Sequence, residues 1–445
     1  GAGRAGAEGW SAGVASVEIT PEGPVWMAGY ASRKTPSEGV THPLKAKALA
    51  LRDAEGRAVV WVTADLIGFD RDLTETVAAR VKERHGLPRE SLALFASHTH
   101  TGPVVKRIEQ SLAASGIDPA RGAPNVAYRQ RLESKLVDLV GSALGDLKPS
   151  ELSYGKGKAG FAINRRENTP TGFKIGLNPS GPTDTDVPML RVTDANGQVR
   201  AVVFGYACHN TTMTDKIMTI SGDYAGFAQS EIEAKHPGAV ALFLTGCGAD
   251  ANPNPRGTIE LARAHGHELA EAVEAVLARP DELARVSGTL RAAFAEPNLR
   301  FAGPTDRASY EARLMEPGEG RRKHAARMIA AIDAGKPIES TIPYATQAFA
   351  LGDGLTVLAL AGEVVVDYAI RFKSELAGPG RTLWVSAYAN DVFGYVPSVR
   401  VLREGGYEGG ESFYYSTFPT PFAEDVEETI VTTVKDVVAR ARGSK

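Results

Sequence analysis

The chain has 445 residues, of which 43% are hydrophobic and 23% charged, and a formal net charge of -3. These values are ordinary for a globular protein, and the small negative charge gives no reason to expect a nucleic-acid partner. No apolar run approaches the roughly 20 residues that a membrane-spanning helix needs. The length fits one large domain or two unequal domains. Cys208 and Cys247 are interpreted as buried thiols, although one disulfide bond between them stays open.

Apolar, β-rich runs recur along the chain and end in polar residues that can take part in chemistry. Two pairs of runs are predicted to form hairpins, one across the turn 53–56 and one across the Asn-Gly turn 194–197. The expected strands are residues 46–51, 58–62, 92–96, 189–192, 199–207, 240–244, 355–360 and 383–386.

Amphipathic helical patterns lie between these runs. Because strands and helices interleave, we expect an α/β fold of mixed β-sheets layered with α-helices, with the functional site at the strand ends. Residues 175–188 and 405–421 are rich in Pro and Gly and are predicted to be long surface loops. The expected helices are residues 73–85, 127–147, 224–235, 258–278, 309–334 and 423–442.

Three short motifs carry no function in this interpretation. Residues 9–13 have the spacing of a serine-hydrolase elbow but lack the strand-to-helix turn that presents the serine. Residues 155–160 match a dinucleotide-binding pattern, yet no helix is expected after them. His265 and His267 point to different faces of a predicted helix, so we expect them to be solvated.

His98 and His100 directly follow the strand 92–96. Alternation places residues i and i+2 of an extended chain on the same side, so both rings can address one point. A zinc site needs three or four N, O or S ligands, and His209 and Glu363 come at the ends of other strands. The alternative is that each is an isolated polar residue with a structural role.

Three further charged residues are candidates for the same site. Arg165 follows a Gly-rich stretch and could stabilise a developing oxyanion, or it could be a solvated charge. Asp65 and Asp250 could orient histidine ring nitrogens, as carboxylates beside metal ligands do. Helix capping or turn formation is the competing explanation for both aspartates.

Seven motifs, in order along the chain, resemble those of the neutral ceramidases, zinc-dependent amidases that split the N-acyl bond of ceramide into a fatty acid and sphingosine. Residues 97–103 look like that family's His-Thr-His-Ser-Gly-Pro signature, and residues 207–213 look like its His-x-Thr-Ser-Met segment. The other similar elements are residues 12–21 with 27–30, Asp65, Asn164 with Arg165, Glu363, and Asn390 with Tyr395 and Val396.

By position, the resemblance implies four zinc ligands: His98, His209, Glu363 and Tyr395. It also implies that His100 and Arg165 contact the scissile carbonyl or its oxyanion, and with Asp250 these make up the predicted catalytic residues. The implied reaction is hydrolysis of a linear amide bond by a water molecule that Zn²⁺ activates.

The chain departs from the family in two respects. The loop 248–254 lacks the serine of the family's Gly-Asp-x-Ser-Pro-Asn loop, a loss that attack by an activated water would survive. The resemblance also fills almost the whole chain and leaves no room for the family's C-terminal immunoglobulin-like domain. We therefore expect residues 1–445 to form a single catalytic domain.

The expected function is that of a ceramidase-like zinc amidase in bacterial lipid metabolism. Its substrate would be a small acylated, hydrophobic molecule, with peripheral lipid as a further contact and no nucleic acid. A zinc esterase, a hydrolase of another acylated metabolite, and a non-catalytic protein that binds zinc and ligand are the alternatives. Because members of the family generally act outside the cytosol, we expect export to the periplasm or the medium.

Overall fold

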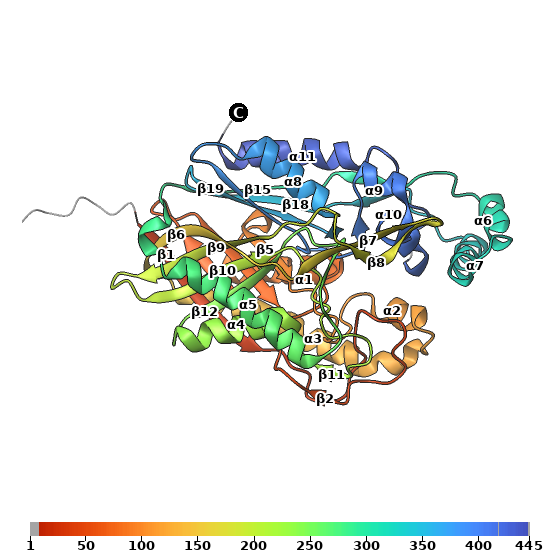
Figure 1. Cartoon of the computed structure of the whole chain (residues 1–445), viewed down its shortest axis with the longest axis horizontal. Coiled ribbons are helices and arrows are strands. Elements are labelled where there is room, and N and C mark those ends of the chain that lie inside the picture. The colour runs from red at the N-terminus through yellow and green to blue at the C-terminus, as the bar shows by residue number, and fades with distance from the viewer. Residues whose placement is uncertain (1–8, 417, 444–445) are drawn as a thin grey trace, which may run out of the picture.

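The computed structural model describes residues 9–416 and 418–443. Two β-sheets are stacked face to face, and a layer of helices covers the outer face of each, giving a mixed α/β fold of four layers (Figure 1). The predicted fold class is confirmed.

The central strands of the larger sheet carry hydrophobic side chains on both faces. In β4, Val60 and Val62 face the helices, whereas Val59 and Trp61 face the second sheet, as the two-residue period of a strand requires. The strands, in sheet order, are β12 (Val240–Thr245), β10 (Val199–Tyr206), β9 (Asp186–Asp194), β6 (Lys148–Lys158), β1 (Trp10–Glu18), β3 (Lys45–Arg52), β4 (Ala58–Ala64) and β5 (Leu92–Ala96), with β14 (Ala284–Val286) beside β6.

The second sheet packs against the first through residues such as Phe349, Val357 and Trp384, which share one hydrophobic cluster with Trp61. Its strands, in order, are β15 (Leu290–Ala295), β18 (Thr346–Leu351), β19 (Leu355–Leu360) and β21 (Thr382–Ser386). Smaller sheets are β13 (Ala251–Pro253) with β7 (Ala162–Thr169) and β8 (Gly172–Asn178), β20 (Glu363–Val364) with β22 (Tyr395–Val396), β2 (Gly39–Val40) with β11 (Thr219–Ile220), and β16 (Asn298–Arg300) with β17 (Thr341–Pro343).

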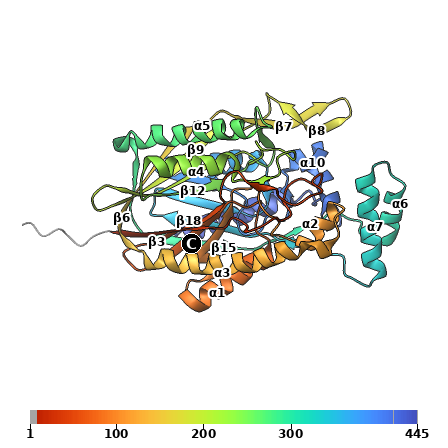
Figure 2. The ribbon, with the colours of Figure 1, turned by 90° about the horizontal axis from the view of Figure 1, so that it is seen from below.

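Helices α1, α3, α4 and α5 cover the outer face of the larger sheet, and α8 and α11 cover the second sheet. Figure 2 shows α6 and α7 as a helical hairpin that projects from one end of the molecule. The helices are α1 (Arg71–His85), α2 (Ile108–Ala114), α3 (Ala123–Gly145), α4 (Asp223–Lys235), α5 (Ile259–Leu277), α6 (Arg307–Leu314), α7 (Glu319–Asp333), α8 (Val366–Leu376), α9 (Val399–Glu404), α10 (Gly406–Gly409) and α11 (Val426–Ala441).

Both predicted hairpins are confirmed as the antiparallel pairs β3–β4 and β9–β10. The helix expected over 309–334 is wrong, because the chain breaks at Pro317 and Gly318, whose φ of 109° ends the helical path, and two helices form. The loop expected over 175–188 is also wrong at both ends, since β8 occupies residues 175–178 and β9 occupies residues 186–188.

The second predicted surface loop, 405–421, is not on the surface throughout. It contains α10 and a short 3-10 helix, Glu411–Tyr415, and it buries Glu408 and Phe413. Glycines with positive φ at 405, 406 and 410 let the chain turn tightly between these pieces. The segment is therefore part of the interior that surrounds the candidate site.

Two other expectations have clear outcomes. Cys208 and Cys247 are both buried free thiols, so the disulfide bond left open by the sequence does not form in this structure. Among residues 9–416 and 418–443, no helix has both the length and the apolar character to cross a membrane.

Candidate metal centre and active site

Three parallel strand pairs bring the candidate residues together. The pairs are β4–β5, β10–β12 and β19–β21, and each leads at its C-terminal end into a candidate residue or its neighbours. A bridge between Phe95 and Ala389, with Ala96 N donating to Tyr388 O at 3.2 Å, joins the ends of the two sheets. The site thus lies at the meeting point of both sheets, as predicted for strand ends.

His98 is held in an unusual backbone conformation two residues after β5. Its φ is 62°, in the left-handed region that non-glycine residues seldom adopt, and its N–H donates to Leu66 O at 2.9 Å. The ring Nδ1 lies 2.6 Å from Ile67 O. Because a carbonyl can only accept, Nδ1 carries the hydrogen and Nε2 keeps a free lone pair.

His209 follows β10 and is fixed in the same way. Its Nδ1 lies 2.9 Å from Gly248 O, so its Nε2 also keeps a free lone pair, and its backbone N–H donates to Ala251 O at 3.0 Å. A Cβ on Gly248 would collide with the backbone of Cys208, which is why a glycine lies behind the histidine.

Glu363 and Tyr395 are brought side by side by the parallel pairing of β20 with β22, in which they are direct register partners. Glu363 Oε2 lies 3.2 Å from His98 Nε2 and 3.2 Å from His209 Nε2. The Tyr395 hydroxyl lies 3.3 Å from His209 Nε2. The structure therefore brings all four predicted ligands to one point.

The spacing of these donor atoms suits a zinc ion. Donor atoms in a tetrahedral array about 2.0 Å from zinc lie about 3.3 Å from one another. Among the described residues, Glu363 Oε2 receives no hydrogen bond, and it faces two imidazole lone pairs. With both rings neutral, this arrangement is repulsive, and a positive charge at this point, either a proton on a ring or a cation between the groups, makes these contacts attractive.

His98, His209, Glu363 and Tyr395 are called the cluster below, and burial sets the charge states of these side chains. It lowers the pKa of His209 to about 4, helped by the charge of Arg165, so this ring is neutral at pH 7. Burial also acts to raise the pKa of Glu363, but the neighbouring His98 and His209 outweigh it and hold that pKa well below its usual range. A neutral imidazole and an ionised carboxylate are the forms that bind a metal.

His100 lies closer to the cluster than its predicted role requires. Its Nε2 is 3.1 Å from His98 Nε2, and the ring nitrogens of His98, His100 and His209 all lie within 4.8 Å of one another. The distances alone do not separate a third histidine ligand from a histidine that contacts substrate. Arg33, which the sequence analysis missed, holds His100 in place by donating from Nη1 to its carbonyl at 2.5 Å.

Gly29→Ala is expected to displace the His100 ring. Gly29 has a φ of 94°, and a Cβ at this position would collide with the imidazole, so alanine is strained and overlaps the ring. We expect turnover to fall at least about tenfold, because moving the His100 ring misplaces a group that is predicted to contact the substrate. Turnover and metal content of the purified variant check this. Gly56→Ala, where φ is 84° but the space is open, is the matched control, and equal activity of both variants would contradict the account.

Arg165 is buried and links the cluster to a region that the sequence analysis treated as a loop. Its Nη2 donates to the Tyr395 hydroxyl at 2.9 Å, and its Nε donates to Glu408 at 2.7 Å. Its Nη1 donates to Asn252 Oδ1 at 3.2 Å, in the loop 248–254. Guanidinium has five N–H donors, so two take part in none of these three bonds. Nothing in the Gly-rich sequence around Glu408 singled this residue out.

Asp250 contacts other groups than the histidines. Its Oδ1 accepts from Val366 N at 2.9 Å and its Oδ2 accepts from Asn164 Nδ2 at 3.2 Å, so it ties the first turn of α8 to β7. Burial raises its pKa to about 6. Asp65 likewise accepts from Lys45 N and Gln229 Nε2. The idea that these aspartates orient the histidine nitrogens is wrong, because backbone carbonyls do so.

Asp250→Ala is expected to lower the free energy of unfolding by about 2 kcal/mol, because two buried donors lose their acceptor. Urea denaturation checks this, with Asp250→Asn as the milder variant that keeps one acceptor. Asp250 was predicted to be catalytic, and turnover of the asparagine variant tests that role. If Asp250→Asn folds with normal stability and metal content but has no activity, the carboxylate takes part in the chemistry.

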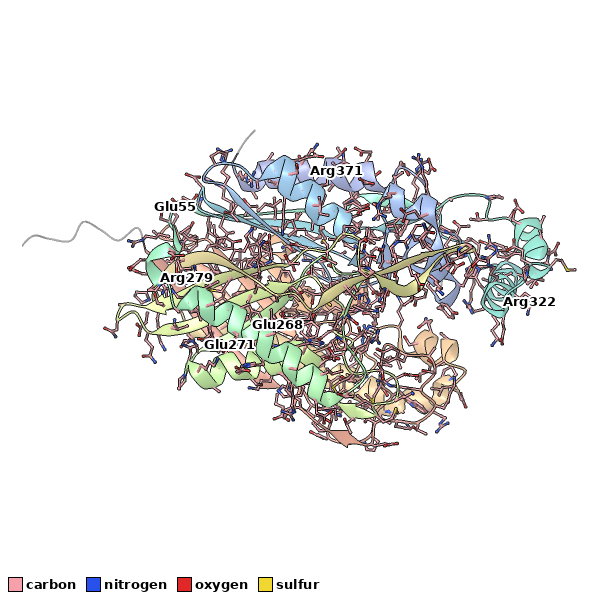
Figure 3. All side chains as sticks on the ribbon, viewed as in Figure 1. Glu55, Glu268, Glu271, Arg279, Arg322 and Arg371 are labelled. Atoms are coloured by element: carbon pink, nitrogen blue, oxygen red, sulfur yellow. The ribbon has the colours of Figure 1, made fainter. Side chains whose placement is uncertain are left out.

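A second group of possible metal-binding residues lies on the surface between α4 and α5: Glu231, His267 and Glu271. His267 Nδ1 lies 2.9 Å from Glu231, and Lys235 pairs with both glutamates, so ion pairing accounts for this group (Figure 3 labels Glu271). Its neighbour His265 is buried, stacks on Phe161 and bonds to Pro255 O, so the expectation that it is solvated is wrong.

A cavity of about 180 Å³ opens beside the cluster and is lined by Glu363 and Tyr395. Most of the residues that line it belong to the segment 405–421, and its walls include the aromatic side chains of Phe393, Tyr407, Phe413, Tyr415, Phe418 and Phe422. Such a wall favours an apolar ligand group next to the polar cluster.

A mixed α/β fold with buried imidazoles and a carboxylate converging at its strand ends defines a protein with a candidate metal centre of enzymatic type. The chain belongs to the neutral/alkaline non-lysosomal ceramidase family, since residues 10–273 match the model of that family's N-terminal part. The resemblance drawn from the motifs is confirmed.

Individual relatives agree with this assignment. The neutral ceramidase of Pseudomonas aeruginosa is 27% identical over 262 residues, which cover 54% of this chain and 37% of that protein. The neutral ceramidase of Mycobacterium tuberculosis is 27% identical over 257 residues, which cover 52% of this chain and 38% of that protein. The crystal structure of neutral ceramidase from P. aeruginosa superposes with a TM-score of 0.75 at 21% identity, covering 98% of this chain and 75% of that one.

Proposed function

We propose that this chain hydrolyses the N-acyl amide bond of a ceramide-like lipid at a bound zinc ion. Membership of the ceramidase family supports an amide-bond hydrolase. One observation supports a bound metal: the imidazole lone pairs of His98 and His209 converge on Glu363 Oε2. Among the described residues, this buried carboxylate oxygen receives no hydrogen bond. Zinc, the metal of the proposal, favours this mixture of nitrogen and oxygen ligands.

The residues that would hold zinc are His98, His209, Glu363 and Tyr395, with His100 near enough to contact either metal or substrate. When bound, zinc supplies a Lewis acid that polarises the scissile carbonyl and makes water a better nucleophile at neutral pH.

The side chains around the cluster would then act on the substrate directly. The two spare N–H groups of Arg165 can stabilise negative charge on the carbonyl oxygen, and burial keeps this interaction strong. The His100 ring, whose pKa burial lowers well below its usual range, is neutral and can accept or pass on a proton. Asn252, in the loop that lacks the family's serine, accepts from Arg165 Nη1 and helps to position the guanidinium, and attack by an activated water requires no hydroxyl nucleophile in that loop.

The aromatic cavity would hold an apolar acyl or sphingoid chain and exclude water from the reacting amide. Its volume of about 180 Å³ accommodates only the part of a long chain next to the amide, so the remainder would extend beyond it.

Metal removal and restoration tests this function. Protein treated with a chelator and then with one equivalent of zinc would be assayed on a short-chain ceramide, on N-lauroyl amides and on a matched ester. We expect no turnover without metal, recovery with zinc, and cleavage of the amides. Protein that binds no zinc, or that is inert on every amide after zinc addition, would exclude the proposal. Cleavage of the ester alone would favour the esterase alternative.

A further inference from the structure

A second cavity adjoins the one beside the cluster. It has a volume of about 270 Å³, and Lys106, Phe393, Tyr415 and Ser416 line both cavities. The remaining lining comes from α2 and its N-terminal flank, from Val392, and from Arg327 on α7. The second cavity therefore lies directly beside the one that Glu363 and Tyr395 line.

Three cations line the second cavity, and no carboxylate does. Lys106 Nζ donates to Val392 O at 2.5 Å. The Arg107 guanidinium lies 5.8 Å above the Phe418 ring. Arg327 Nη2 donates to the carbonyl oxygens of residues 414 and 416, at 2.6 and 3.2 Å. Among the described residues, none of the three forms a salt bridge, although many other arginines of the chain do.

The nearest acidic groups do not neutralise this cluster. Asp70 accepts from the Arg107 backbone N–H at 2.9 Å, but its carboxylate pairs with Arg129 and caps α1 through Leu73 N. Asp391 is buried nearby and acts on Lys106 and Arg107 only from beyond salt-bridge distance. Glu363, which lines the first cavity, also acts on Lys106 from beyond that distance. Neither aspartate lines the cavity. Lys106 and Arg107 are half-buried, whereas Arg327 is exposed at the edge of the cavity. Cations that are partly removed from water without an anionic partner suit the binding of an anion.

We propose that this second cavity binds an anionic group of the substrate, so that preferred substrates are acyl amides that carry a carboxylate, sulfonate or phosphate. The inference rests on the proposed amidase function for the position of the amide, but the anion site is defined by Lys106, Arg107 and Arg327 alone. Arginine supplies two parallel donors to such a group, and lysine adds a point charge. A neutral ceramide would leave these cations without a partner.

Matched pairs of soluble amides test the proposal. N-octanoyl-4-aminobutyrate carries its carboxylate on the amine side and N-octylsuccinamate carries it on the acyl side; the neutral partner of each has a carboxamide in place of the carboxylate. N-octanoyltaurine separates sulfonate from carboxylate. We expect the intact protein to prefer at least one anionic amide to its neutral partner by about tenfold in kcat/KM and in calorimetric Kd, and to lose this preference in high salt.

Arg107→Gln is expected to lower this preference about tenfold, to near unity, and Arg327→Gln serves if the first variant folds poorly. Arg322→Gln is the matched control, because Arg322 is exposed on α7 and does not line the cavity (Figure 3). Equal kcat/KM and equal Kd for every anionic and neutral pair would overturn the proposal. If the protein binds anionic amides more tightly than their neutral partners but turns over no amide, the proposed amidase function is overturned, whereas the anion site is supported.

Discussion

His209→Ala is expected to remove both the bound zinc and the activity. The ring supplies a lone pair fixed by the contact of its Nδ1 with Gly248 O, and alanine deletes this ligand. Glu363 Oε2 would keep His98 as its only imidazole neighbour at 3.2 Å. We expect zinc to fall below about one tenth of an equivalent and kcat to fall at least about a thousandfold. Elemental analysis and turnover of the same preparation measure both.

His267→Ala is the matched control for this substitution. His267 is exposed on α5, on the outer face of the larger sheet, and pairs with Glu231 of α4, so zinc and activity are expected to stay unchanged. A His209→Ala protein that is verified to be free of zinc and still hydrolyses the amide would contradict the assignment of this residue as a ligand.

Arg165→Met is expected to keep zinc and lose rate. Methionine fills part of the buried space but removes the donor to Tyr395 and the two N–H groups proposed to stabilise the oxyanion. Glu408 keeps its second partner, Arg166 Nη1 at 2.9 Å, so the buried carboxylate retains a cation and the protein is expected to fold. Loss of a donor to an oxyanion costs about 10²- to 10³-fold in kcat. Single-turnover kinetics and zinc content separate chemistry from metal loss.

Arg403→Met serves as the control for the loss of one arginine, because Arg403 is exposed and pairs only with Glu424 at the surface. If Arg165→Met retains full kcat, the guanidinium has a structural role at Tyr395 and Glu408 and none in the reaction. If it loses zinc, its contact with Tyr395 matters for metal binding more than the proposal states.

The strands that carry His98, His209 and Glu363 could be predicted from the sequence because each is a short, continuous apolar run that is buried on both faces. A strand fixes the direction of the residues that follow it, so the meeting of these side chains at strand ends was also predictable. The contact of Tyr395 with His209 was not, because it depends on the register of β20 with β22, two strands of two residues each. The motif resemblance alone indicated this tyrosine.

Other parts of the site left no pattern in the sequence. The segment 405–421 has the composition of a surface loop, yet tertiary packing folds it over the cluster and buries Glu408 against Arg165 and Arg166. Arg33 is one arginine among many in the sequence, and only the fold brings it to the carbonyl of His100. Export of the protein and the single catalytic domain over residues 1–445 stay predictions.

The presence of a metal at the cluster is the central claim, and a crystal structure with anomalous scattering data at the zinc absorption edge tests it most directly. We predict one zinc ion per chain, bound by His98, His209, Glu363 and Tyr395, with an anomalous signal that appears above the edge and vanishes below it. Metal-free density at this position in protein prepared with excess zinc, with the histidines and Glu363 bonded only to one another or to water, would contradict the account.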